Sequence, residues 1–198
     1  MEEFQPNPDS VRMIFIRHGH DTGSLNGDSK RELTENGIRQ AVASAELFKT
    51  VNFDFIFSSD LLRTQQTCAE ICAYQSARSQ LNTGLREIRP FYLMGNPEMT
   101  EGAGKPVRNF LESVMQLKKG SLVLAVAHCH LIRYILTFKN VRSEEYRSVN
   151  DLFNMDLLPR DGCTIDMSNC GVSVIDIDHE GGMMPCLINY NEHTKKSS

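Results

Sequence analysis

Four of the six histidines form two His-x-His pairs, and each pair follows a short apolar run directly. The first pair is His18 and His20, and the second is His128 and His130. Apolar runs of this length and composition are typical of buried strands, so both pairs are expected at strand ends. We therefore predict that they share one site at the edge of a sheet.

Two kinds of chemistry fit such histidines. Neutral imidazoles bind zinc or iron, and alternate residues of a strand point the same way, so the pairs could be metal ligands. Alternatively, one histidine of each pair acts on a phosphoryl group whose oxygens are bound by arginines. Arg17 beside His18, and Arg63 at the start of a predicted helix, favour phosphoryl chemistry, because a guanidinium repels a dication but matches phosphate oxygens. Gly19 lets the backbone approach an anion closely. We expect no metal and no cofactor.

The elements that position these residues alternate along the chain. Apolar runs predict strands at residues 11–16, 53–57, 121–127, 172–177 and 186–190. Helical spacing, with Thr34 as an N-cap, Ser58 to Asp60 as a capping cluster and Pro106 in a first turn, predicts helices at residues 34–50, 61–74, 106–119 and 131–138. Strands alternating with helices predict an α/β fold, a three-layer α/β/α sandwich with a mostly parallel central sheet. Ligands of such sheets bind beyond the carboxyl ends of the strands.

Length and composition are those of one globular domain. The chain has 198 residues, of which 40% are hydrophobic and 23% charged. We expect a flexible tail at residues 1–10, a single domain at 11–192 and a second tail at 193–198. Residues 81–104 are expected to be mostly loop, and residues 141–163 carry no clear pattern.

Charge and hydropathy exclude several partners. The net charge of −4 argues against nucleic acid and anionic membranes, which need a basic face. The longest apolar runs have the length of a strand, so no membrane span is expected. The first twelve residues contain no readable signal peptide, and we expect a cytoplasmic protein whose six cysteines are reduced. Cys68 and Cys72, one helical turn apart, are expected to be buried core thiols.

Taken in order, the motifs resemble the histidine phosphatase superfamily, also called phosphoglycerate-mutase-like, in the branch without the acid-phosphatase and phytase elaborations. The resemblance covers nearly the whole chain. The motifs that carry it are Arg17-His18-Gly19, Leu33-Thr34-Glu35-Asn36-Gly37 with Gln40-Ala41, Ser58-Ser59-Asp60-Leu61-Leu62-Arg63-Thr64-Gln65-Gln66-Thr67, Leu85-Arg86-Glu87, Val126-Ala127-His128, Ile132-Arg133 and Asn169.

The resemblance implies a role for each of five residues. His18 would be the nucleophile that becomes phosphohistidine, and Arg17 and Arg63 would bind the phosphoryl oxygens. His128 would complete the pocket, and Glu87 would donate a proton to the leaving oxygen. Elementary chemistry agrees: an imidazole nitrogen can attack phosphorus and leave again, and the oxygens need fixed positive charge.

The chain also departs from the family pattern. His20-Asp21 stands where the family usually has Glu-Thr, and Cys129-His130 follows the second histidine in place of glycine. Ser24 replaces a common asparagine, although Asn26 is near. Ser24 and Cys129 are candidate substrate-binding residues beside the phosphate, although Cys129 also suits a small packed residue.

Other histidines and carboxylates remain candidates for the surroundings of the pocket. His20 and His130 are expected at its rim. Asp21, Glu98 and Glu101, in predicted loops, are alternatives to Glu87 as the acid.

The sequence thus predicts a cofactor-independent phosphatase that hydrolyses phosphomonoesters. A phosphoglycerate mutase is the alternative among enzymes. The resemblance implies that such mutases are longer chains, with extra segments that enclose the active site. A catalytically weak phosphoprotein-binding scaffold is the alternative outside enzymes. The partner would be a phosphorylated small molecule or a phosphoprotein, selected by residues 89–104 and 141–163. The sequence leaves the oligomeric state open.

Overall fold

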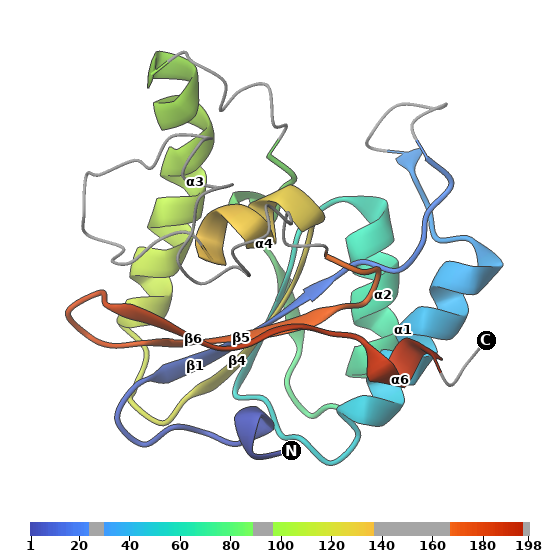
Figure 1. The fold of residues 1–198 in the computed structure, drawn as a ribbon, viewed down its shortest axis with the longest axis horizontal. Helices are drawn as coiled ribbons and strands as arrows, with labels where there is room; N and C mark the ends of the chain where they lie inside the picture. The colour runs from blue at the N-terminus through green and yellow to red at the C-terminus, as the bar shows by residue number, and fades with distance from the viewer. Residues whose placement is uncertain (24–29, 89–96, 137–166, 196–198) are drawn as a thin grey trace, which may run out of the picture.

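The computed structural model describes residues 1–23, 30–88, 97–136 and 167–195, with only the backbone for residues 97–103 (Figure 1). The strands in these residues form a six-stranded sheet in the order β3-β2-β4-β1-β5-β6. They are β1 (Val11–Arg17), β2 (Phe55–Ser58), β3 (Ser79–Leu81), β4 (Leu122–Ala127), β5 (Val172–Ile177) and β6 (Met183–Tyr190). The helices are α1 (Glu35–Leu47), α2 (Leu62–Cys72), α3 (Pro97–Met115), α4 (Cys129–Leu136) and α6 (Glu192–Lys195), with 3₁₀ turns η1 (Glu2–Phe4) and η4 (Thr83–Leu85).

Helices cover both faces of the sheet, which confirms the predicted three-layer α/β/α fold (Figure 1). On β1, Met13 and Phe15 pack in one apolar core with residues of α3 and α4. Ile14 and Ile16, which point to the opposite face, pack in a second core with residues of α1 and α2. The sheet is mostly parallel as expected, because β1 to β4 run in one direction, whereas β5 pairs antiparallel with both β1 and β6.

The strand register brings three carboxyl ends to one edge of the sheet. Arg17 of β1 is paired with Ala127 of β4, and Ser58 of β2 is paired with Val126 of β4. The residues that follow these three strands therefore leave the sheet side by side. This is the edge at which the sequence predicts the site.

Two glycines hold the segment after β1 against the start of α1. Thr34 is the N-cap of α1, as predicted, and its hydroxyl oxygen accepts a hydrogen bond from the backbone N–H of Gly37. A Cβ on Gly37 would lie 2.0 Å from the carbonyl oxygen of His20, and a Cβ on Gly19 would lie 2.5 Å from the carbonyl oxygen of Gly37. Both positions therefore require glycine, because two backbones pass too close for a side chain.

The predicted helix starts were wrong at α3 and α4, whereas α2 begins two residues after the predicted capping cluster. The α3 helix begins at Pro97, nine residues before the predicted start, and Pro106 lies inside it. The 3₁₀ turn η4 packs so closely on α3 that a Cβ on Gly84 would lie 2.5 Å from the Pro106 carbonyl oxygen, and such tertiary contact outweighs propensity. The α2 helix begins after Leu61, with no side-chain cap. The α4 helix begins at Cys129 rather than Leu131.

The strand bounds were closer to prediction. β5 has the predicted bounds, whereas β2 is shifted by up to two residues and β6 begins at Met183 instead of Cys186. The short edge strand β3 was not predicted, because its three residues are exposed and carry no alternating pattern. Residues 141–163 lie outside the described residues.

Both described ends of the chain are packed where flexible tails were predicted. Phe4 in η1 is buried and contacts the rings of Phe48 and Tyr190. His193 in α6 places Nε2 3.1 Å from the hydroxyl of Ser44. An aromatic ring at each end supplies the anchor, and neither ring belongs to a periodic pattern that would reveal it in the sequence.

The five cysteines in the described residues are free thiols, and Cys163 lies outside those residues. Cys68 is buried as predicted, whereas Cys72 is only partly buried. Of the helices in the described part of the chain, none combines the length and apolar character needed to cross a membrane.

Replacing Gly37 by alanine tests the contact between the two glycines. Helix propensity alone would favour alanine by about 1 kcal/mol. The clash with the His20 carbonyl should reverse that sign, and we expect the free energy of unfolding to fall by about 1–3 kcal/mol. Urea denaturation measures it, with Asn36→Ala, at the exposed neighbouring position, as the matched control expected within about 0.5 kcal/mol of the unmodified protein. A more stable Gly37→Ala protein would contradict the account.

Candidate active site

His18 follows β1 and is 3% exposed. Its Nδ1 lies 2.8 Å from the carbonyl oxygen of Gly19, which can only accept a hydrogen bond, so Nδ1 carries the proton of the neutral ring. The other nitrogen, Nε2, accepts a hydrogen bond of 3.2 Å from Nε of Arg63. The unprotonated nitrogen of His18 therefore faces a guanidinium.

Arg63, in the first turn of α2, is the largest of the fully buried side chains, with 1% exposed. Thr67, one turn further along α2, holds the helix against the segment after β1. Its hydroxyl donates to the carbonyl oxygen of Arg63 at 2.9 Å and accepts from the backbone N–H of Gly19 at 3.1 Å. The helix and the histidine segment are thus fixed to each other by side chain and backbone together.

His128 follows β4 and is fully buried. Its ring centroid lies 5.2 Å from that of His18, in an edge-to-face arrangement. Nε2 of His128 lies 3.0 Å from the hydroxyl of Ser59, and Nδ1 has no hydrogen-bond partner among the described residues. The structure therefore brings one histidine of each pair together, as the sequence predicted.

Arg17 ends β1, and one of its terminal nitrogens donates to the carbonyl oxygen of Met167. Its buried Nε has no hydrogen-bond partner in the part of the chain that the structure describes. The positive charge of Arg17 acts on both His18 and His128, so all three groups belong to one electrostatic site.

Burial and neighbouring charge keep both histidines neutral. Burial lowers the pKa of His18 to about 3. The hydrogen bond to Gly19 acts in the opposite direction and raises the pKa, whereas the charges of Arg63 and Arg17 lower it further. Burial, followed by the repulsion that a protonated His18 would exert and by the charge of Arg63, also lowers the pKa of His128 well below its ordinary value. Both imidazoles are therefore neutral at pH 7.

A partly buried ion pair beside His18 was not predicted. The side chain of Asp21 is 5% exposed, accepts two hydrogen bonds of 2.8 Å from Nη2 of Arg31, and has Oδ2 3.5 Å from both Nδ1 of His18 and Nε of Arg63. Burial favours the protonated form of Asp21, but hydrogen bonds from Arg31 and from the N–H of Gly23 outweigh it, and its pKa is lowered. The group is a carboxylate, which does not suit the role of alternative acid.

Glu87 lies against the N-terminus of α4, beside His128. Its Oε1 accepts three backbone N–H hydrogen bonds of 3.1 Å, from Ile88, His130 and Leu131. Its Oε2 lies 3.3 Å from Nδ1 of His130. The structure thus positions one oxygen of Glu87 rigidly and leaves the other with a single described partner.

The structure describes only some of the other residues that the sequence predicted for the site. His20 is exposed, with Nδ1 2.9 Å from the Thr34 hydroxyl, and Cys129 is half-buried at the start of α4. Ser24 lies outside the described residues. Glu98 and Glu101 lie on α3 rather than in a loop, where the structure describes only the backbone.

The second histidine of each pair does not join the first. His20 and His130 have separate partners, Thr34 and Glu87. Within the described ranges, no three His, Cys, Asp or Glu side chains are grouped so that they could hold a metal ion.

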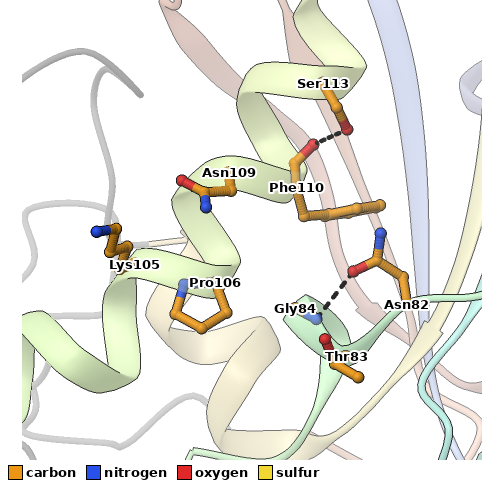
Figure 2. A pocket seen from close by; sticks show the side chains of 8 residues that line it. All are labelled: Asn82, Thr83, Gly84, Lys105, Pro106, Asn109, Phe110 and Ser113. Carbon is orange, nitrogen blue, oxygen red and sulfur yellow. Dashed lines mark hydrogen bonds between the residues drawn. The ribbon is translucent and has the colours of Figure 1, made fainter.

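A separate pocket of about 440 Å³ lies between η4 and α3 (Figure 2). Lys105, Asn109 and Ser113, at helical spacing on α3, line it together with Asn82 and Thr83 at η4. The residues that line it are Asn82, Thr83, Gly84, Lys105, Pro106, Asn109, Phe110 and Ser113. None of the residues predicted for phosphoryl chemistry is among them.

Comparison with known proteins agrees with this geometry. Residues 13–100 match the sequence profile of the Histidine phosphatase superfamily (branch 1). A Yersinia pestis protein named "Probable phosphoglycerate mutase GpmB" is 31% identical over 149 aligned positions, which cover 60% of this chain and 69% of the relative. The chain belongs to the histidine phosphatase superfamily.

Solved structures share the fold at lower identity. Phosphoserine phosphatase from Entamoeba histolytica, solved with 3-phosphoglyceric acid, has a TM-score of 0.66 at 21% identity, covering 93% of this chain and 99% of that one. The protein histidine phosphatase SixA, solved with tungstate, has a TM-score of 0.60 at 18% identity, covering 88% and 93%. These similarities show the fold and leave the substrate open.

The protonation of the two histidines can be measured. We expect the rings of His18 and His128 to stay neutral at pH 5.5, where an ordinary histidine is about 90% protonated. Ring ¹⁵N chemical shifts report this, with His18→Ala and His128→Ala used for assignment. Because the unfolded chain binds these protons below about pH 6.5 and the folded chain does not, the same burial makes stability fall as pH drops from 6.5 toward 3. A midpoint near pH 6.5 for either ring would contradict the account.

Proposed function

We propose that the protein is a phosphatase that hydrolyses phosphomonoesters through a phosphohistidine on His18. The observation that carries this proposal is the geometry at Nε2 of His18, a buried, unprotonated nitrogen 3.2 Å from the Arg63 guanidinium. A neutral imidazole beside fixed positive charge is a nucleophile placed where a phosphoryl anion would bind.

In the first half-reaction, Nε2 of His18 attacks phosphorus, an N–P bond forms and the bond to the leaving oxygen breaks. Arg63 exchanges its hydrogen bond with Nε2 for one with a phosphoryl oxygen. The phosphorylated imidazole ring is more positive than the free one. Its Nδ1–H keeps the hydrogen bond to the Gly19 carbonyl oxygen, and the Asp21 carboxylate lies 3.5 Å from Nδ1. In the second half-reaction, water attacks phosphorus, the N–P bond breaks and inorganic phosphate leaves.

His128 would contribute a neutral donor to the same oxygens. In the proposed arrangement the Ser59 hydroxyl, which accepts the backbone N–H of Leu61 at 3.4 Å, donates its own proton to Nε2 of His128. The ring proton would then be on Nδ1, the atom without a hydrogen-bond partner among the described residues. Arg17, Arg63 and this N–H would together stabilise the charge that develops on the phosphoryl oxygens.

Glu87 is the proposed proton donor to the leaving oxygen. Because three backbone N–H groups occupy Oε1, the proton would reside on Oε2. Oε2 is also the oxygen near His130, which would orient it. Glu87 binds the backbone of His130 and Leu131, which closely follow His128 in the sequence. This supports a position for Glu87 beside the phosphoryl group.

Phosphoglycerate mutase activity is the second candidate, favoured by the similarity to "Probable phosphoglycerate mutase GpmB". Both reactions pass through the same phosphohistidine and differ in what accepts the phosphoryl group. The products separate them: a phosphatase releases inorganic phosphate from 3-phosphoglycerate, whereas a mutase returns the 2-isomer. A scaffold that only binds would do neither. A screen of phosphorylated metabolites and phosphopeptides with the purified protein would identify the substrate.

Trapping the intermediate tests the proposed role of His18. Rapid quenching during turnover of a ³²P-labelled phosphomonoester should leave acid-labile, base-stable label on the protein, and His18→Ala should remove it. His20→Ala is the matched control, because this exposed histidine lies two residues away and contacts Thr34 instead. Full labelling of His18→Ala, or loss of label only in His20→Ala, would refute the assignment.

Leaving-group dependence tests the proposed role of Glu87. Glu87→Gln keeps an oxygen for the three N–H donors but cannot donate the acidic proton. Turnover of an alkyl phosphate should fall on the order of 10²-fold, whereas p-nitrophenyl phosphate, whose leaving group needs no proton, should be affected far less. Arg63→Ala should impair both substrates, because it acts on the transferred group. Equal loss for both substrates in Glu87→Gln would show that the carboxylate only positions α4.

A further inference from the structure

Two cysteines on α2 form a close pair away from the proposed phosphoryl site. The Sγ atoms of Cys68 and Cys72 lie 3.7 Å apart, and neither thiol is in a disulfide. Cys68 is 2% exposed, whereas Cys72 is partly exposed and is the last residue of the helix. One thiol of the pair can therefore meet a solvent-borne reagent, and the other is held behind it.

The surroundings make the two thiols unequal. A hydrogen bond from Cys68, opposed by burial and aided by hydrogen bonds from Ser79, lowers the pKa of Cys72 to about 7. The same contact, together with burial, raises the pKa of Cys68. Cys72, the more exposed sulfur, is thus also the more readily ionised of the two. This is the division of roles between an attacking and a resolving cysteine.

We propose that Cys72 and Cys68 are a peroxide-sensitive dithiol that oxidises to an intrahelical disulfide. The Cys72 thiolate attacks one oxygen of hydrogen peroxide, the O–O bond breaks, and a sulfenic acid forms on Cys72 while hydroxide leaves. The Cys68 sulfur, losing its proton to that hydroxide, then attacks the Cys72 sulfur, and the second hydroxide leaves. The balance is two thiols and one peroxide giving one disulfide and two waters.

The helix sets the structural consequence of this oxidation. Side chains four residues apart in a helix have Cβ atoms about 5–6 Å apart, whereas a disulfide needs about 3.5–4.5 Å. The last turn of α2 must therefore open, and it can, because Cys72 ends the helix. That turn leads into Tyr74 and Gln75, which hydrogen-bond to Glu46 and to the Phe48 carbonyl on the α1 side. Oxidation should loosen these contacts, while Arg63 lies in the opposite end of α2.

Peroxide treatment of the full-length protein, followed by alkylation and tryptic mapping, tests the proposal. Residues 64–78 form one tryptic peptide that contains both cysteines, and it should lose the mass of two hydrogens and resist alkylation until reduced. In Cys68→Ala, a dimedone probe should instead label a sulfenic acid on Cys72, and Cys72→Ser should give neither product. Cys186→Ser is the matched control and should leave the disulfide yield unchanged, since Cys186 is exposed but its pKa is raised by burial and Asp176.

The pH dependence separates this pair from an ordinary thiol. The rate of oxidation should rise only about tenfold from pH 6 to pH 8, against roughly 70-fold for a thiol with an unperturbed pKa. A disulfide that joins other cysteines, an alkylatable pair after peroxide, or sulfenic acid on Cys68 in Cys72→Ser would overturn the proposal. None of these readouts uses phosphatase activity, so the result is independent of the proposed function.

Discussion

The hydrogen bond from Arg63 to His18 is the interaction on which the site depends. It exists only while the imidazole is neutral, because a protonated ring has no lone pair to offer and would repel the guanidinium. Burial supplies that neutrality, since it lowers the pKa of His18 to about 3. The same burial makes the positive charge of Arg63 costly unless it is compensated, and the Asp21 carboxylate, 3.5 Å away, provides compensation.

The fold meets this constraint by bringing three strand ends and one helix together. The parallel register of β1, β2 and β4 places His18, Ser59 and His128 side by side, and Thr67 locks α2 to the segment after β1. The close contact between Gly19 and Gly37 holds the same segment against α1. The strand register, the Thr67 contacts and the glycine contact involve backbone atoms, whereas Arg63 with His18 and Ser59 with His128 meet through side chains alone.

The sequence predicted the sheet and the pairing of His18 with His128, because apolar runs and the residues that end them are local features. It could not predict the ion pair of Asp21 with Arg31, since two loop charges ten residues apart give no periodic signal. Ser59 was predicted as part of a helix cap, and its hydroxyl also bonds His128, a contact that depends on the β2–β4 register. The α3 helix extends through Pro106, where η4 packs on it, and a proline in the sequence is more typical of a helix start than of its interior. Ser24 and most of the segments expected to select a substrate lie outside the described residues.

The central claim is that Nε2 of His18 is the atom that bonds to phosphorus. A crystal structure with vanadate, which adopts the five-coordinate geometry of the transferring phosphoryl group, tests it most directly. The account predicts vanadium bonded to Nε2 of His18, with Arg17, Arg63 and Nδ1 of His128 in contact with its equatorial oxygens. Vanadate bonded to another residue, or held in the site with Nε2 still hydrogen-bonded to Arg63, would contradict it.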